Sequence, residues 1–351
     1  MREAKNSIIT IKDIARECGV SIATVSNVLN GRKKTKPETE EKIKATVNKY
    51  GFMPNSSAKG LRNGRSGVIG VIVEDMAQFT TPDIVEGIMK YLEDRGYMVV
   101  LQNLRLYARW SDKWFNEEGM IRNAVDKAVT TLNALRVEGI IYVAVHYRET
   151  NLISNNVKVP AVMAYARECN PTVPSVVIDD EDGGYRAVKY LLMKGHENIG
   201  ILAGNEDNMH TQFRLRGARR AALESGIRID DSLVVYAGWN KKLGYEGYKK
   251  LAHKGITALF CMSDQLAGGV YAYLDEHGLE VRRDLAIIGY DDKYFAEFFT
   301  PGLTSMKLPL EEIGEVSARL LLEKINDTPS KVGLIDNIVR VPCTMMIRES
   351  V

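Results

Sequence analysis

The stretch GVSIATVSNVLNG, residues 19–31, carries hydroxyl, amide and small apolar side chains but no charge. Hydroxyls suit phosphate oxygens, small apolar groups suit thymine methyl groups, and an amide can pair with the donor and the acceptor on an adenine edge. A surface without bulky or acidic groups can also approach base edges in the major groove. These residue types therefore predict a contact with double-stranded DNA. The candidates are Ser21, Ile22, Ala23, Thr24, Ser26, Asn27 and Asn30.

Two short helices across a glycine turn would position these side chains. Thr10 and Asp13 have the spacing of a capping box that opens a helix over IKDIAREC, residues 11–18. Gly19 supplies the left-handed turn that ends it, and Ser21 can cap a second helix over residues 22–29. At 100° per residue, one arc of the second helix packs on the first and the opposite arc faces outward. The inner arc holds Thr24, Val25, Val28 and Leu29, and the outer arc holds Ile22, Ala23, Ser26 and Asn27. The pattern predicts a helix-turn-helix, and a plain helical hairpin is the alternative.

The amino-terminal region is also basic. Residues 1–66 contain 14 Lys or Arg against 6 Asp or Glu, a net charge of +8 in a chain whose total is +2. The region is rich in Ile, Val and Ala, so we expect it to fold rather than to form a solvated tail. A third helix over PETEEKIKATVNKY, residues 37–50, would close its core through Ile43 and Val47. A basic domain on an acidic body predicts a nucleic-acid contact at one end of the chain.

The composition argues against several other classes of protein. The 351 residues are 45% hydrophobic and 26% charged, as in globular proteins, and no apolar run approaches the ~18 residues that span a bilayer. The first residues lack the apolar core of a secretory signal and the four cysteines are scattered, so we expect a cytoplasmic protein without disulfides or a membrane partner. The sequence has no phosphate-binding loop, dinucleotide fingerprint, nucleophile elbow or HExxH pair, and its five histidines are isolated. We therefore expect no enzyme activity, no metal and no cofactor.

From residue 68 onward, apolar runs alternate with amphipathic segments. The segments between the runs, such as PDIVEGIMKYLEDRG and LAGGVYAYLDEHG, have helical spacing and end at glycine. Two similar blocks of this alternation predict an α/β body of two doubly wound parallel-sheet lobes. Ligands bind in such folds where strand ends face a cleft, so we expect a small-molecule site between the lobes. The runs typical of buried parallel strands are GVIGVIV, YMVVLQ, EGIIYVAV, ENIGILAG, LVVYAG, ITALFCM and LAIIGYDD.

Almost the whole chain resembles the lactose repressor (LacI/GalR) family of bacterial transcription regulators. The matching segments, in order and spacing, include TIKDIARECGVSIATVSNVLNG, KYGFMPN, SVVIDDEDGG, KGHENIGILAG, RLRGARRAAL, CMSDQLAGGVYAYL and AIIGYDD. The resemblance implies a helix-turn-helix head over residues 1–53, a hinge helix and linker over 54–67, and an effector-binding and dimerisation core over 68–351. The core would be similar in fold to periplasmic sugar-binding proteins. It would divide into lobe N, about residues 68–178 and 306–341, and lobe C, about residues 179–305 and 342–351.

The resemblance also implies how the hinge contacts DNA. In this family, paired hinge helices of a homodimer sit in the minor groove and drive a leucine between base pairs. Leu61 matches that wedge, and the other hinge candidates are Asn55, Ala58 and Lys59. The family's major-groove readers fall on Ile22, Ala23 and Asn27. A hinge helix over about residues 55–61 is too short to persist alone in water, so it should fold only when something holds it.

For the effector, the resemblance implies a set of residues around the cleft. Arg214 and Asp291 match the family's effector-binding Arg and Asp, and at the mouth of the cleft each can bind two adjacent hydroxyls of a small polar ligand. Trp239 falls near the family's ring-stacking aromatic residue. Ser263 stands where Asn is common, and Tyr165 stands where an acidic residue is frequent. The full set is Asp75, Phe79, Tyr165, Arg214, Trp239, Ser263, Asp264 and Asp291, with His210 and Gln212 as further candidates in lobe C.

These features together predict a cytoplasmic, homodimeric transcription regulator, expected to be a repressor, that binds palindromic operator DNA and a small effector. A sugar or sugar derivative is the family's commonest effector, whereas Arg214, His210 and Phe79 would also suit a purine or a sugar phosphate. A free-standing solute-binding protein and an enzyme are the competing classes. The segment LRLYARWSDKWFNEEG, residues 104–119, is longer than the family's usual connection and would extend the cleft rim, grip a partner or form a surface helix.

Overall fold

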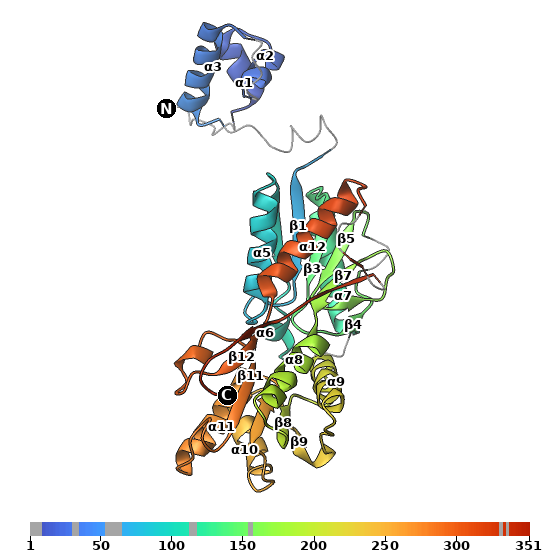
Figure 1. The fold of residues 1–351 in the computed structure, drawn as a ribbon. Coiled ribbons are helices and arrows are strands. Elements are labelled where there is room, and N and C mark those ends of the chain that lie inside the picture. The colour runs from blue at the N-terminus through green and yellow to red at the C-terminus, as the bar shows by residue number, and fades with distance from the viewer. Residues whose placement is uncertain are drawn as a thin grey trace. The chain divides into compact units, whose positions relative to one another are not determined.

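The computed structural model describes residues 9–29, 35–52, 65–111, 118–153, 157–329, 333–334 and 337–351, and Figure 1 shows the fold. The chain divides into two compact units, Met1–Gly67 and Val68–Val351. Among the helices of the described residues, none is both long and apolar enough to cross a membrane. The predicted DNA-contacting positions that lie outside the described residues are Asn30, Asn55, Ala58, Lys59 and Leu61.

The first unit is a bundle of three helices around a small apolar core. At the start of the first helix, the Asp13 carboxylate accepts hydrogen bonds from the backbone N–H and the hydroxyl of Thr10, at 3.0 and 2.6 Å. Gly19 ends that helix with a φ of 67°, in the left-handed region that favours glycine. Val25 and Ile43 are fully buried, so apolar burial holds the second and third helices together. The helices are α1 (Ile11–Cys18), α2 (Ile22–Leu29) and α3 (Pro37–Tyr50).

Lobe N of the second unit is built on a six-stranded sheet with the order β13-β7-β5-β3-β1-β2, in which all neighbouring strands are parallel. Its strands are β1 (Val68–Val73), β2 (Met98–Asn103), β3 (Gly139–Val143), β5 (Ala161–Ala164), β7 (Ser175–Ile178) and β13 (Ile338–Val341). Its helices are α5 (Thr81–Glu93), α6 (Leu106–Trp110), α7 (Glu118–Ala134) and α12 (Leu310–Ile325). Val71 packs with α5 and α12, whereas the next residue, Ile72, packs with α7. Both faces of the sheet are therefore buried, which explains the unbroken apolar run of β1.

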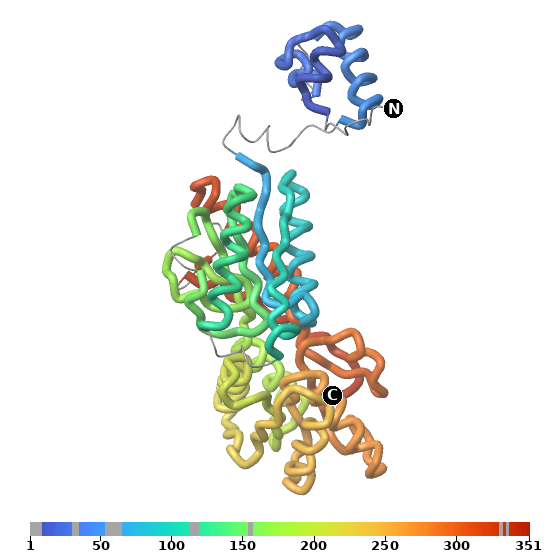
Figure 2. The backbone as a smooth tube through the Cα atoms, turned by 180° about the vertical axis from the view of Figure 1, so that it is seen from behind, coloured from blue at the N-terminus to red at the C-terminus, as the bar shows by residue number. Residues whose placement is uncertain are grey.

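Lobe C is built on a second six-stranded sheet with the order β14-β12-β11-β10-β8-β9, in which only the pair β12 and β14 is antiparallel. Its strands are β8 (Ile199–Ala203), β9 (Val234–Tyr236), β10 (Ala258–Cys261), β11 (Ala286–Asp291), β12 (Thr304–Lys307) and β14 (Thr344–Met346). Its helices are α8 (Asp180–Met193), α9 (Met209–Glu224), α10 (Lys241–Lys249) and α11 (Asp264–Glu276). The carboxyl terminus lies in this lobe (Figure 2), where the Ser350 carbonyl accepts a hydrogen bond from the Ile287 N–H at 2.9 Å.

The predicted fold class is confirmed, since a helical head precedes an α/β body with two largely parallel sheets. All seven apolar runs contain strands of these sheets. The strands β5, β7, β12, β13 and β14, of three or four residues each, lie outside the seven runs and were not predicted. One expected boundary is shifted. The sequence placed the change from lobe C to lobe N between residues 305 and 306. In the structure, β12 pairs with β11 over residues 304–307, so residues 306 and 307 belong to the sheet of lobe C.

Candidate functional site

The exposed face of α2 carries the candidate groove-contacting residues. Ile22 is 43% exposed and Ala23 is exposed, whereas Val25 is buried in the bundle core. Ser26 and Asn27 are half-buried at the edge of this face. Exposed and buried residues therefore lie on opposite sides of α2, as the period of an α-helix predicts. The α2 face, defined by these four outward residues, presents two small apolar groups, one hydroxyl and one amide without charge.

Ser21 and Thr24 form the start of α2. The Ser21 hydroxyl oxygen accepts a hydrogen bond from the Thr24 N–H at 3.1 Å, and the two hydroxyl oxygens lie 2.9 Å apart. Ser21 is thus the N-cap that its residue type predicts. Ser21 is exposed and Thr24 is half-buried, so both hydroxyls border the α2 face.

In the second unit, Arg214 lies on α9 at the centre of a cluster of buried polar groups. Its Nε donates to Oδ1 of Asp180 at 2.7 Å, its Nη1 donates to the carbonyl oxygen of Met262 at 2.7 Å, and its guanidinium lies 3.7 Å from the centroid of the Tyr290 ring. The residue is only 2% exposed. Burial opposes the charge of Arg214, but Asp180, Tyr290 and Asp291 together outweigh it and raise the pKa of Arg214. The guanidinium is therefore fixed as a cation with a defined orientation.

Asp291 ends β11 beside this guanidinium. Its Oδ1 lies 3.9 Å from Nη1 of Arg214, and its Oδ2 accepts a hydrogen bond from the Ser263 hydroxyl at 3.2 Å and lies 3.7 Å from Nζ of Lys293. Burial raises the pKa of Asp291, and the charges of Arg214 and Lys293 oppose that rise. Three side chains from three segments of lobe C thus surround one carboxylate, and convergent polar groups of this kind are typical of a site for a polar ligand.

Asp264 lies behind this group and is fully buried. Its Oδ1 accepts a hydrogen bond from the Ser305 hydroxyl at 2.6 Å, and its Oδ2 accepts one from the Lys293 N–H at 2.7 Å. Burial and the neighbouring charge of Asp291 raise the pKa of Asp264 to about 8. The sequence-based prediction placed Asp264 among the ligand contacts, whereas the structure gives it the role of holding the segment around Lys293.

Aromatic side chains from both lobes border the cluster. Phe79, in the loop after β1, is 48% exposed, and Nζ of Lys293 lies 3.8 Å from the centroid of its ring. Trp239 is half-buried in lobe C, with its ring centroid 5.9 Å from the Arg214 guanidinium. A Cβ atom at Gly204 would overlap the Trp239 ring, so glycine is required at the end of β8 for this ring to lie there. Both rings offer flat apolar surface beside charged groups.

In lobe N, Asp75 follows β1 and is 4% exposed. Its Oδ2 accepts a hydrogen bond from the Tyr107 N–H at 3.1 Å, which places α6 beside the loop after β1. The Tyr107 hydroxyl lies 2.6 Å from Nε2 of His146, which follows β3. Burial, with smaller contributions from the charges of His210 and Arg148, lowers the pKa of His146 to about 3. The helix α6, which belongs to residues 104–119, thus lies at the rim of the predicted cleft. Residues 112–117 are not among the residues that the structure describes.

Tyr165 and His210 face each other across the two lobes. Tyr165 is 3% exposed and its ring centroid lies 5.5 Å from that of His210. Nδ1 of His210 lies 2.7 Å from Oδ2 of Asp180, and its Nε2 lies 3.1 Å from the backbone nitrogen of Tyr147. Gln212 is exposed and donates to the Glu206 carbonyl oxygen at 3.3 Å, so it lies away from this cluster.

The structure corrects one expectation about the accessibility of the site. Arg214 and Asp291 were expected at the open mouth of the cleft, but their side chains are only 3% and 8% exposed. The physical reason is that the Arg214 guanidinium on α9 lies close to the carboxylates of Asp180 and Asp291, and unlike charges attract each other more strongly when buried than in water. Any ligand that binds both groups must therefore insert its hydroxyls into an existing network.

Several members of this network were not predicted. Asp180 follows β7, His146 and Tyr147 follow β3, and Lys293 follows β11. Asp180 could have been predicted from the sequence, because Asp179-Asp180 directly follows an apolar strand and the carboxyl ends of parallel strands meet at one edge of the sheet. The pairing of these residues with Arg214, Tyr165 or Phe79 depends on which strands are neighbours in the sheet, which sequence spacing alone does not specify.

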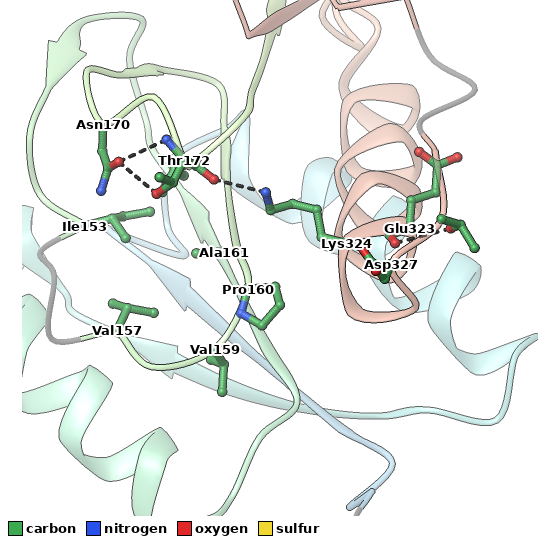
Figure 3. Close-up of a pocket in the computed structure, with 12 residues that line it drawn as sticks. Ile153, Val157, Val159, Pro160, Ala161, Asn170, Thr172, Glu323, Lys324 and Asp327 are labelled. Atoms are coloured by element: carbon green, nitrogen blue, oxygen red, sulfur yellow. Dashed lines mark hydrogen bonds between the residues drawn. The ribbon is translucent and has the colours of Figure 1, made fainter.

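One cavity lies in lobe N, and another lies between the lobes beside Asp180 and Tyr147 of this network. The first has a volume of about 520 Å³ and lies beside the end of α12 (Figure 3), where Nζ of Lys324 donates to the Thr172 carbonyl oxygen at 3.0 Å. The second has a volume of about 340 Å³ and is bordered by Tyr147, Asp180, Phe213 and three arginines. Neither of these two cavities is lined by a residue of the predicted effector set.

Two family descriptions match the chain, "Bacterial regulatory proteins, lacI family" over residues 10–55 and "Periplasmic binding protein-like domain" over residues 188–351. Catabolite control protein A of Priestia megaterium is 32% identical over 347 residues, which cover 97% of this chain and 99% of that protein. The transcriptional repressor PurR of Haemophilus influenzae is 30% identical over 348 residues, which cover 97% and 98% of the two chains.

Solved structures of transcription regulators are also similar. The Lac repressor dimer bound to operator and the anti-inducer ONPF has 26% sequence identity and a TM-score of 0.78, with 98% of this chain and 99% of that chain covered. The complex of the transcriptional regulator CelR with cellobiose has 27% identity and a TM-score of 0.64, with 97% and 99% covered. The similarity therefore extends over the head and the body of the chain.

Proposed function

The chain belongs to the lacI family of bacterial regulatory proteins and is a DNA-binding transcription regulator, and on this premise we propose that it is a repressor whose operator affinity is set by a small polar effector between its lobes. The observation that carries the proposal is the polar cluster around Arg214 and Asp291, where groups from both lobes converge. A ligand that contacts both lobes favours one lobe arrangement over the other. In our proposal, the hinge over residues 54–67 transmits that preference to the head, residues 1–53.

The α2 face supports a specific role for the head. Ile22 and Ala23 are exposed next to Asn27, and no charged side chain of α2 competes with them for the groove. We propose that Asn27 reads a base edge while Ile22 and Ala23 contact thymine methyl groups. Ser21, Thr24 and Ser26 would contact phosphate oxygens, and two heads of a homodimer would occupy the two halves of a palindrome. The hinge residues Asn55, Ala58, Lys59 and Leu61 would then enter the minor groove between them.

Selection from a random pool of DNA duplexes tests this reading of the α2 face. We expect the full chain to enrich one palindromic sequence, and we expect Asn27→Ala to lose preference at one position in each half-site, at a cost of ~1–3 kcal/mol per position. The matched control is Asn48→Ala, which removes the same side chain from an exposed position of α3. If Asn27→Ala enriches the wild-type sequence with the wild-type affinity, the proposed role of Asn27 is wrong.

A neutral sugar or sugar derivative is the effector that fits the cluster best. The Arg214 guanidinium is already bound to Asp180, and Nζ of Lys293 already lies 3.7 Å from the Asp291 carboxylate. Each cation thus has a carboxylate partner, and the site does not need an anionic ligand to balance its charge. Paired carboxylates and guanidiniums bind neighbouring hydroxyls, and the half-buried Trp239 and exposed Phe79 offer faces for a sugar ring. The CelR structure was solved with cellobiose, which supports this class. The alternative, a nucleobase or sugar phosphate, has its support in the relatives named PurR.

A thermal-shift screen of sugars, sugar phosphates and nucleobases distinguishes these classes. A ligand at about 100 times its Kd stabilises the folded chain by ~2.7 kcal/mol, so we expect a neutral sugar to raise the Tm by several degrees. Asp291→Asn should reduce that rise because it removes a carboxylate from the proposed contact. Asp275→Asn, an exposed position on α11, is the matched control and should respond as the wild type does. A response to nucleobases or sugar phosphates alone would replace the sugar assignment with the alternative.

A further inference from the structure

His210 joins the two lobes through one polar contact on each side of its ring. On one side, its Nδ1 lies 2.7 Å from Oδ2 of Asp180 at the start of α8 in lobe C. On the other side, its Nε2 lies 3.1 Å from the backbone nitrogen of Tyr147, which follows β3 in lobe N. The residue is 6% exposed and lies near the rings of Tyr147 and Tyr165. The imidazole is therefore a buried bridge between the lobes.

The backbone partner determines how the ring is protonated. A peptide N–H can only donate a hydrogen bond, so Nε2 of His210 must accept with its lone pair and carries no proton. The proton of the neutral ring is then on Nδ1, from which it donates to Asp180. A second proton would have to bind at Nε2, where it would point at the Tyr147 N–H. The bridge therefore exists only while the imidazole is neutral.

The charges around the ring oppose one another. Asp180 would attract a protonated imidazole, but its other oxygen already accepts a hydrogen bond from Arg214 at 2.7 Å, and that guanidinium repels a further positive charge. His146 is held neutral by burial, with a pKa of about 3, so it does not titrate near neutral pH. The titratable and charged groups around the ring are Asp180, Arg214, Asp291, His146, Tyr147 and Tyr165.

We propose that His210 is a positioning residue of the effector site, which links Asp180 and Arg214 to lobe N, and that a proton on His210 separates the lobes. Asp180 divides its two oxygens between Arg214 and His210, so the bridge to Tyr147 connects the carboxylate that orients Arg214 to lobe N. Acid thereby opposes any effector that binds both lobes, because the two events favour different lobe arrangements. The inference rests on the proposed effector site and adds proton uptake as a second input to it.

The tautomer of His210 is the first test. In the full chain labelled with ¹⁵N-histidine, two-bond ¹H–¹⁵N correlation spectra at pH 7.0 distinguish the two neutral forms of each ring. We expect the ring that is missing in His210→Gln to be the form with its proton on Nδ1. A ring with its proton on Nε2, or a charged ring, at pH 7.0 would overturn the proposal.

The distance between the lobes is the second test. Nitroxide labels can be placed on the native Cys169, which is exposed in lobe N, and on Arg228→Cys, which is exposed in lobe C, since the other three cysteines are buried. Double electron–electron resonance then reports their separation, with an excess of unlabelled chain to remove distances between copies. From pH 7.0 to pH 5.5 we expect the wild type to gain a population with a different lobe separation.

Two variants show whether His210 causes that change. His210→Gln offers its side-chain oxygen to the Tyr147 N–H and does not titrate, so its distances should be the same at both pH values. His253→Gln is the matched control at an exposed position of lobe C and should behave as the wild type does. An unchanged wild type, or an equal change in His210→Gln, would refute the proposal. Should His210→Gln fail to fold, single glutamine variants of the other four histidines identify the His210 ring as the one that none of them removes, and its tautomer still decides the question.

These measurements use no effector, so their failure is distinct from failure of the proposed function. If no sugar, sugar phosphate or nucleobase shifts the Tm, the effector site is wrong even where the lobes respond to acid. If a sugar binds and the distance between the lobes does not change with pH, only the proposed role of His210 is wrong.

Discussion

At the scale of single residues, two buried carboxyl groups define the chemistry of the cluster in lobe C. Asp264 and Asp291 come from neighbouring strand ends, and the Ser263 hydroxyl donates a hydrogen bond to Asp291. Because nearby anions repel each other strongly in a buried site, one of the two is favoured in its neutral form. Burial and the charge of Asp291 raise the pKa of Asp264 to about 8, and Asp291 keeps two cations beside it. Asp291 is therefore the better ligand for hydroxyls.

The raised pKa of Asp264 predicts a pH dependence of stability. Its ordinary value is 3.8 and its folded value is about 8, so folding binds a proton between these values. The stabilisation that this proton gives is complete below about pH 4 and is lost as the pH rises through 8. Asp264→Asn reproduces the hydrogen bonds of the protonated acid and does not titrate. We therefore expect the free energy of unfolding of Asp264→Asn, relative to the wild type, to rise from pH 5 to pH 8.

Urea unfolding at several pH values measures this difference. The exposed Asp275→Asn is the matched control, and its free energy of unfolding should stay parallel to that of the wild type. Parallel curves for Asp264→Asn as well would mean that Asp264 is ionised in the folded chain across this range.

Residue types show only part of such a site in advance. Arg214 and Asp291 were predicted because their positions match a family pattern, and both lie in the cluster. Asp180, Lys293 and His146 were missed because each is brought to the cluster by sheet order. The burial of Arg214 was also unexpected, since it follows from the pairing with Asp180 rather than from the type or spacing of either residue.

At the scale of elements, glycines allow α5 and α12 to cross closely in lobe N. A Cβ atom at Gly314 of α12 would overlap the Ile84 carbonyl oxygen of α5, and one at Gly87 of α5 would overlap the Glu311 carbonyl oxygen of α12. Backbone at this distance cannot move aside as a flexible side chain would. The two helices are therefore held at one separation by the absence of side chains.

Gly314→Ala is expected to destabilise the chain by ~1–3 kcal/mol, because the added methyl group forces the two helices apart. Gly119→Ala is the matched control, since Gly119 lies in α7 with open space around it and alanine favours helix by up to about 1 kcal/mol. Urea unfolding of both variants measures the contrast. Equal stability of the two variants would show that the α5–α12 crossing tolerates a wider separation.

The elements themselves were predicted to different extents. Long apolar runs such as GVIGVIV and amphipathic segments ending in glycine predicted seven strands and most helices of the body. Both faces of each sheet are buried, so these runs show no alternation and were read by length and flanking turns. The short β5, β7, β12, β13 and β14 were not predicted, although β9 and β10 are as short and were, so strand length alone does not separate the two groups.

At the scale of the whole molecule, three short connections link the two lobes of the body. They join β7 to α8, β12 to α12, and β13 to β14, and each is only a few residues long. Short connections confine backbone rotation to a few positions, so the lobes can close and open as nearly rigid bodies. A ligand and a proton acting on groups between the lobes, such as Asp291 and His210, would therefore shift one common equilibrium.

The most direct test of the account is the affinity of the full chain for its selected operator duplex, measured by fluorescence anisotropy with and without the sugar identified by thermal shift. We predict that a saturating sugar changes the Kd by at least about tenfold, a coupling of ~1.4 kcal/mol. Asp291→Asn should bind the duplex with wild-type affinity in the absence of sugar and lose the response at the same sugar concentration. An operator Kd that is identical with and without bound sugar would contradict the central claim that the lobes control the head.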